Sequence, residues 1–195
     1  EAAWYARFFS AEQLGVLQVV VIGFAAGFAV TYALAHRGGW ASRWLALAAS
    51  GLAVLALAGG FNLVADSAMA GRTGGIFLIA VVADLVLLAI AFLRPEFRRL
   101  ESVGGGLLFV LLTQWMLVRL DADKLGWALG LSVGFALLHT LFPLWMRRVQ
   151  PGLAMPMSSQ LFPAIGLLLM VAPLLKELPM PWTFWPVVEV IDVLA

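Results

Sequence analysis

Six long apolar stretches, separated by short loops that hold nearly all of the charges, constrain the fold of this chain more than any other feature. A helix needs about 20 apolar residues to cross a hydrocarbon core of roughly 30 Å, and lipid offers no partner to an unpaired backbone amide. The stretches therefore predict membrane-crossing helices over residues 14–35, 44–64, 75–93, 104–118, 125–146 and 161–175. The predicted fold class is all-α, a polytopic transmembrane helix bundle of six spans plus a partial seventh.

The stretches over 104–118 and 161–175 are short for a bilayer, at about 22 Å of helix each. Either they extend into the flanking loops or the membrane is thinner beside them. Pro163 suits a first helical turn, where its missing amide hydrogen costs nothing. Pro173 is expected to kink or stop the sixth helix near its end.

The chain divides into three parts on this pattern. Residues 1–13 mix aromatic and charged side chains and predict an amphipathic segment lying in the headgroup layer. Residues 14–183 form the six-helix transmembrane region. Residues 184–195 begin a further apolar helix, and with Glu1 in place of a start methionine they suggest a piece of a longer protein.

Composition excludes several classes of protein. The chain is 63% hydrophobic and 12% charged, whereas soluble domains carry about 25% charged residues. The net charge of +1 makes nucleic acid an unsuitable partner, and the absence of cysteine removes disulfides and thiolate chemistry. The expected partners are the lipid bilayer and other membrane subunits or the rest of a longer chain.

Orientation follows from the loop arginines and lysines. Alternate assignment of the loops gives one side five basic residues, which are Arg7, Arg72, Arg119, Lys124 and Lys176. The other side receives seven, which are Arg37, Arg43, Arg94, Arg98, Arg99, Arg147 and Arg148. The positive-inside rule thus predicts the second side in the cytoplasm and the N-terminus outside.

Asp84 lies near the centre of the third stretch, among apolar residues on both sides. A carboxylate at that depth costs about 2.5 to 3.5 kcal/mol to insert, so it is expected to face the bundle interior. His139 in the fifth stretch lies at nearly the same depth and is a natural partner. Two roles stay open, a proton relay or cation site and a structural hydrogen bond between helices.

Other polar residues of the apolar stretches are expected to join helices. Gln114 is a second candidate partner for Asp84. Asn62 lies near the outer end of its stretch. It either joins two helices by a hydrogen bond or forms a water-filled vestibule together with Asp66. The candidate intramembrane polar site therefore comprises Asp84, His139, Gln114 and Asn62.

Glycines at a spacing of four predict close helix packing, because they leave no side chain to hold a neighbour away. One such face is expected in the first stretch and another in the fifth. The residues concerned are Gly23, Gly27, Gly126, Gly130 and Gly134.

One part of the chain is similar to a known family. It runs from Asp84 to Arg148 and includes the basic loop 94–100, Gln114-Trp115, residues 125–129 and 138–144, and Arg147-Arg148. Residues 161–163 and Trp185-Pro186 extend the likeness. In these features the chain resembles large bacterial polytopic membrane proteins of a family of unknown function, which implies a fragment of a repetitive membrane array and brings no catalytic residues.

Two classes of function agree with the sequence. The first is a structural or interaction module of a bacterial envelope complex; the second is transport of protons or a small solute along a path lined by Asp84 and His139. No HExxH helix, nucleophile elbow or Walker loop is present, so no catalytic, metal or cofactor-binding residues are predicted. An enzymatic activity within the membrane would have to depend on Asp84 and His139, and none is expected.

Overall fold

The computed structural model describes residues 13–150 and 158–194, and all regular secondary structure within them is helical. Five long helices come first, α2 (Leu14–Arg37), α3 (Arg43–Ala65), α4 (Thr73–Leu93), α5 (Arg99–Arg119) and α6 (Leu125–Val149). Three shorter ones follow, α7 (Ser158–Leu169), α8 (Val171–Leu175) and α9 (Phe184–Leu194), and 3₁₀ turns lie at Ser67–Met69, Pro95–Phe97 and Ala122–Lys124. The all-α prediction is confirmed for these residues.

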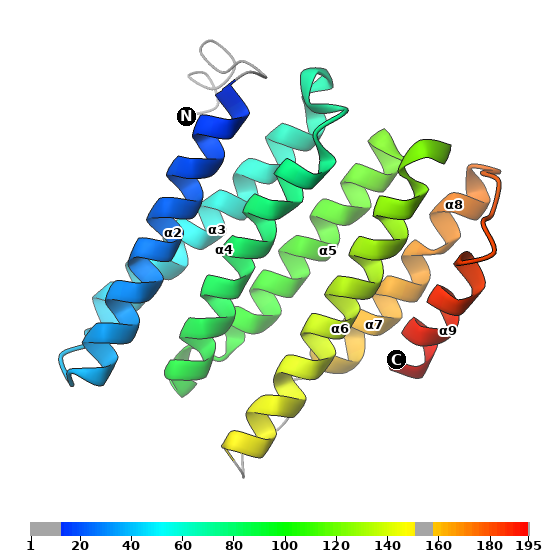
Figure 1. Cartoon of the computed structure of the whole chain (residues 1–195). Coiled ribbons are helices and arrows are strands. Elements are labelled where there is room, and N and C mark those ends of the chain that lie inside the picture. Colours follow the sequence, from blue (N-terminus) through cyan, green and yellow to red (C-terminus); the bar gives the residue numbers. More distant parts are fainter. Residues whose placement is uncertain (1–12, 151–157, 195) are drawn as a thin grey trace.

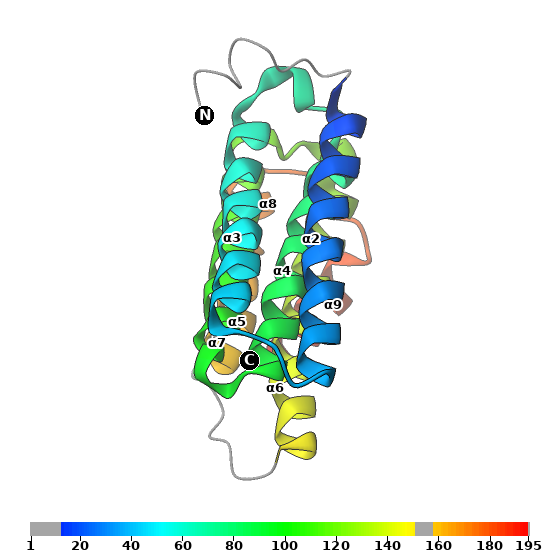
Figure 2. The same ribbon diagram turned by 90° about the vertical axis from the view of Figure 1, so that its left-hand side faces the viewer.

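The long helices run alternately up and down and stand side by side (Figure 1). Figure 2 shows α3, α5 and α7 on one side of the molecule and α2, α4, α6 and α9 on the other. Helix α5 contacts α3, α4, α6 and α7, so it lies at the centre of the packing. The C-terminal ends of α2, α4 and α6 lie at one end of the bundle (Figure 1).

Five helices are long and apolar enough to cross a membrane, and they begin at Leu14, Arg43, Thr73, Pro95 and Ala122 when adjoining 3₁₀ turns are included. Their outward faces carry large apolar side chains such as Val19, Leu55 and Leu117, each at least 60% exposed. Such a surface suits lipid better than water. The short fourth stretch does extend into its flanks, because α5 starts at Arg99.

The predicted sixth span is interrupted. Helix α7 ends at Leu169 and α8 begins at Val171. The break lies there because Pro173 offers no amide hydrogen to the Leu169 carbonyl and its ring crowds that oxygen. Pro163 lies at the sixth residue of α7 and not in its first turn as expected. The count of six crossings is therefore not established by these helices.

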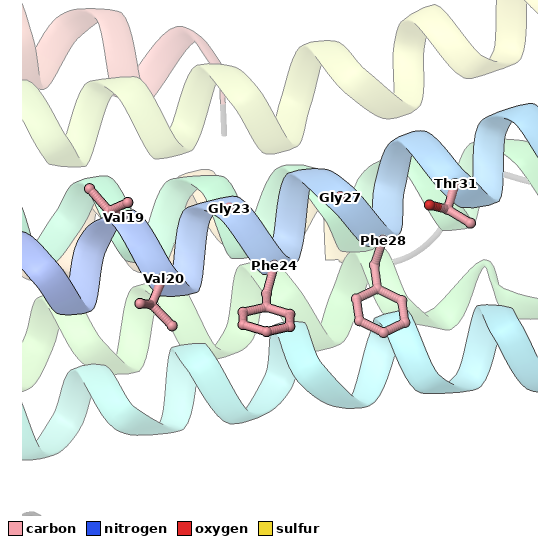
Figure 3. Close-up of a pocket in the computed structure, with 7 residues that line it drawn as sticks. All are labelled: Val19, Val20, Gly23, Phe24, Gly27, Phe28 and Thr31. Carbon is pink, nitrogen blue, oxygen red and sulfur yellow. The ribbon is translucent and has the colours of Figure 1, made fainter.

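The glycine faces were expected to pack against neighbouring helices, and within the described chain they do not. A Cβ built on Gly23, Gly27, Gly126, Gly130 or Gly134 meets no other described helix within 4 Å. All five are exposed, and Figure 3 shows Gly23 and Gly27 on α2 beside Phe24 and Phe28, along an open hollow. The spacing of four identified glycines that share one face of a helix, but it did not reveal that this face points away from the other described helices.

Side chains from neighbouring elements bind the carbonyl groups that helices leave unpaired at their C-termini. Arg119 donates to the carbonyls of Val64 and Ala65, at 3.1 Å each, at the end of α3. Gln150 donates to Phe92 at the end of α4, at 3.2 Å. These bonds fix each helix end to a segment more than 50 residues away in the chain.

The end of α5 is bound by a lysine. The Nζ of Lys176, just beyond α8, donates to the carbonyls of Met116, Leu117 and Leu120 at 2.9, 3.1 and 3.0 Å. The cation also faces the negative end of the α5 dipole. Lys176 therefore fixes α8 to α5, although α8 itself is only five residues long.

The loop after α4 is held by Arg94. Its Nε donates to the hydroxyl of buried Tyr32 at 2.7 Å, and a second nitrogen donates to the carbonyl of Ala41. The hydrogen bond with Tyr32 raises the pKa of Arg94 above its usual value, so the guanidinium stays charged. Arg94 thereby connects α4 to the loop between α2 and α3.

Replacing Lys176 by Met is expected to destabilise the protein by about 1 to 3 kcal/mol, because three backbone carbonyls lose a charged donor. Thermal unfolding in detergent would measure the loss. Lys124→Met is the control, since Lys124 binds Asp121 on the surface, where it lowers the pKa of that carboxyl and contributes less than about 1 kcal/mol. Equal losses in both variants would contradict the assigned role of Lys176.

Candidate functional site

The structure brings Asp84 of α4 and His139 of α6 together. The Oδ2 of Asp84 lies 3.2 Å from the Nε2 of His139, and both side chains are 0% exposed. Two titratable groups buried among membrane-crossing helices are a candidate functional site by their position alone. They also join two helices that both pack against α5.

Two glycines of α5 make room for this pair. A Cβ on Gly104 would overlap the Oδ1 of Asp84. A Cβ on Gly105 would lie 2.9 Å from the Cε1 of His139 and 2.5 Å from the Cε2 of Phe162. Any larger residue at either position would push Asp84 and His139 apart. Their close approach therefore depends on two residues of α5 that have no side chain.

Phe162 of α7 closes the site on the remaining side. Its ring meets the His139 ring edge to face, with centroids 5.1 Å apart, and stacks on Phe109 at 5.4 Å. The side chain is 3% exposed. Four helices, α4, α5, α6 and α7, thus meet around one polar pair.

Asp84 and His139 lie close together, but their hydrogen-bonding atoms are not paired. The alignment of the N–H with Oδ2 does not satisfy hydrogen-bond geometry, and both oxygens of Asp84 and both ring nitrogens of His139 lack a hydrogen-bond partner among the described residues. Pro143 lies four residues after His139 in α6 and offers no amide hydrogen to the His139 carbonyl. The site therefore retains hydrogen-bonding capacity.

The other two residues of the predicted site lie elsewhere. Gln114 donates from Nε2 to the carbonyl of Phe61 at 3.3 Å, so it joins α5 to α3 as expected of a glue residue. It lies ten residues from Gly104, roughly 15 Å along α5. Asn62 is exposed beside a groove between α2 and α3. Asp66 accepts a hydrogen bond from the backbone amide of Ala68 and so caps a 3₁₀ turn.

Three features were missed by the sequence analysis. Gly104 and Gly105 were not recognised as packing residues, and Phe162 was not recognised as a lid over His139. Glu101, at 1% exposure, lies one helical turn before Gly105 on the same face of α5. The sequence signal that could have identified Glu101 is the position of a carboxyl one helical turn before two adjacent glycines, Gly104 and Gly105.

The described residues contain no group of three or more His, Asp or Glu side chains that could hold a metal ion. Comparison of the chain with protein-family models, with curated proteins and with solved structures finds no match. The fold and the site define the class only as an all-helical membrane protein with a buried aspartate–histidine pair.

Gly105 and Gly106 offer a matched test of the packing. Gly105→Ala places a methyl group against two rigid rings and is expected to destabilise the protein by about 1 to 3 kcal/mol. Gly106 has nothing within 4 Å of a built Cβ, so Gly106→Ala is expected to stabilise by up to about 1 kcal/mol through helix propensity. Thermal unfolding of both variants in one detergent decides; a stabilising Gly105→Ala would show that the rings do not lie where described.

Proposed function

We propose that this chain is a membrane-spanning structural or interaction module of a bacterial envelope complex. In this role the bundle presents outward faces to other membrane subunits or to further helices of a longer chain. The resemblance to large bacterial polytopic proteins supports the bacterial inner membrane as the location. The Asp84–His139 pair then acts as a clamp that holds four helices in the shape that partners recognise.

The observation that carries this proposal is the pair of unoccupied glycine faces. Gly126 and Gly130 line a hollow on α6 together with Asp123, Trp127 and Leu131. Gly23 and Gly27 line another on α2. Glycine weakens a helix interior, and in membranes it is concentrated where another helix approaches closely. Since no described helix covers these faces, a helix from another subunit is the partner that fits them.

Gly130→Leu is expected to weaken association with a partner subunit or a second copy by about 1 to 3 kcal/mol, because it fills the hollow where the helix would pack. The control is Gly51→Leu, which alters an exposed glycine of α3 that belongs to neither face. Blue native electrophoresis and cross-linking of native membranes would report assembly. Identical behaviour of the two variants, or a chain that stays monomeric in its own membrane, would reject the proposal.

We further propose six crossings with the arginine-rich end in the cytoplasm. In this topology α7 and α8 together form the sixth crossing despite the break at Met170, and α9 begins the seventh. The seven arginines in the loops and helix ends at that end support this orientation under the positive-inside rule. The N-terminus then lies outside.

Single cysteines test this orientation cleanly, because the chain has none of its own. Arg99 and Ala122 are both exposed and lie at opposite ends of α5. An impermeant thiol reagent added outside intact cells is expected to modify Ala122→Cys and to spare Arg99→Cys until the cells are opened. The reverse pattern would invert the topology.

The second candidate function is proton transfer or proton-coupled transport, and the adjacency of Asp84 and His139 favours it. A carboxyl and an imidazole at 3.2 Å can exchange a proton, and neither is engaged by another described residue. Such pairs mark proton paths in many membrane proteins.

Asp84→Asn separates the two candidates. It preserves size and hydrogen bonding but removes titration, so proton flux into proteoliposomes is expected to fall to background if the pair transfers protons. Assembly and thermal stability are expected to stay near those of the parent protein. Proton flux that persists in Asp84→Asn would remove the transport candidate.

A further inference from the structure

A groove runs between α2 and α3, with Ile79 of α4 at its floor. It has a volume of about 370 Å³, within the range of small-molecule sites. Phe24 of α2 and Leu55 of α3 line it and are 59% and 60% exposed, so the groove is open at the surface of the bundle. Among the described residues that line it, Asn62 alone has a polar side chain. The groove therefore offers an apolar ligand a place to lie, with a polar group at one position.

The groove is hollow because small residues line its α3 wall. Ala56 and Gly59 lie one helical turn apart on this wall, and a Cβ built on Gly59 meets nothing within 4 Å. Helix α2 does not close the space, since only 11% of its most apolar 18 residues are buried, against 61% in α4. Figure 2 shows α2 and α3 in front of α4, on which both of them pack. The space between α2 and α3 is thus left for a molecule from outside the described chain.

The length of the groove matches one leaflet of a bilayer. On α3 it extends from Leu52 to Leu63, which is about 16 Å at helical rise. Leu63 lies next to the end of α3, and Leu52 lies near its middle. A hydrocarbon core of roughly 30 Å gives the acyl chains of each leaflet a reach of about 15 Å. The groove therefore runs from the membrane surface to the midplane, which is the depth that one acyl chain occupies.

The width of the groove suits a single acyl chain and not another helix. Helices α2 and α3 contact each other, and the axes of helices in direct contact lie about 8 to 10 Å apart. A further helix, about 10 Å wide with its side chains, cannot enter the space between them, whereas a chain of methylene groups can. A polar solute is excluded as well, because the described lining offers it one amide and no charged group, and a buried polar group without a partner is costly.

We propose that this groove holds one acyl chain of a phospholipid from the leaflet beside the loop that follows α3. Asn62 is exposed at the surface end of the groove, so its amide can donate a hydrogen bond to an ester or phosphate oxygen of the same lipid. The bound chain fills space that neither helix fills and adds apolar contacts that hold α2 to the bundle. The inference goes beyond the role in assembly and does not depend on it.

Gly59→Leu tests the proposal by filling the groove with a side chain of the protein itself. The intact chain is purified and washed in a mild detergent, and native mass spectrometry then measures the phospholipid that it retains. The parent protein is expected to keep one phospholipid per chain, and Gly59→Leu is expected to keep several-fold less. Palmitoyl-oleoyl phosphatidylethanolamine added to delipidated protein is expected to raise the unfolding temperature of the parent and not that of Gly59→Leu, because a ligand stabilises only a protein that has its site.

Gly51→Leu is the matched control, since Gly51 is also an α3 glycine with nothing within 4 Å of a built Cβ but does not line the groove. It is expected to retain lipid as the parent does. Asn62→Leu keeps the groove but removes the amide, and is expected to lower retention several-fold; it decides the matter if Gly59→Leu does not fold.

Three results would overturn the proposal. The first is a parent protein that retains no phospholipid, or that retains no more of it than Gly59→Leu or Asn62→Leu. The second is an equal loss of lipid in Gly51→Leu. The third is a second protein chain, in place of lipid, that is bound to the parent and lost in Gly59→Leu, which would assign the groove to a partner subunit.

Discussion

A polar side chain within a membrane-crossing helix has no water to bind, and the packing around Asp84 answers that constraint. The carboxyl finds its partner in His139, on a helix two places further along the chain. The contact requires α4 and α6 to approach across α5, and α5 allows it only because residues 104 and 105 lack side chains. Phe162 then excludes lipid from the fourth side. Four helices thus meet around one buried pair.

The same constraint acts on the backbone at helix ends. A carbonyl that has no partner inside its helix must find one outside, and Arg119, Gln150 and Lys176 supply donors to the ends of α3, α4 and α5. Each donor lies in a later element of the chain than the helix it caps. The bundle is therefore connected at its ends by polar contacts and in its interior by apolar packing and the Asp84–His139 pair.

The sequence allowed the helices and the polar pair to be predicted for simple physical reasons. Length and apolar composition identify helices in lipid, and rise per residue places Asp84 and His139 at similar depths. The inward face of each helix was harder to predict. In a membrane both the lipid-facing and the buried faces are apolar, so the pattern that orients helices in soluble proteins is weak. Gly130 was therefore assigned to a buried seam, whereas Gly105, with less regular spacing, is the glycine that two rings contact.

Pro173 was expected to kink or stop the sixth helix, and the structure has a break there, whereas the lid formed by Phe162 was not predicted. Proline disturbs the carbonyl four residues before it, which moves the interruption to Leu169 and Met170. Phe162 is one aromatic residue among 13 phenylalanines, and only its contact with His139 distinguishes it. The break thus has a local cause in the proline, while the position of Phe162 depends on the tertiary packing of α7 on α5 and α6.

A double-mutant cycle on Asp84 and His139 tests the central claim most directly. Asp84→Leu, His139→Phe and the double variant would be compared by reversible unfolding in one detergent. If the pair holds the four helices together, each single change leaves a buried polar partner and the two effects are non-additive, with a coupling of at least about 1 kcal/mol. Additive effects, with a double variant no more stable than the sum of the single losses, would show that the pair does not organise the bundle.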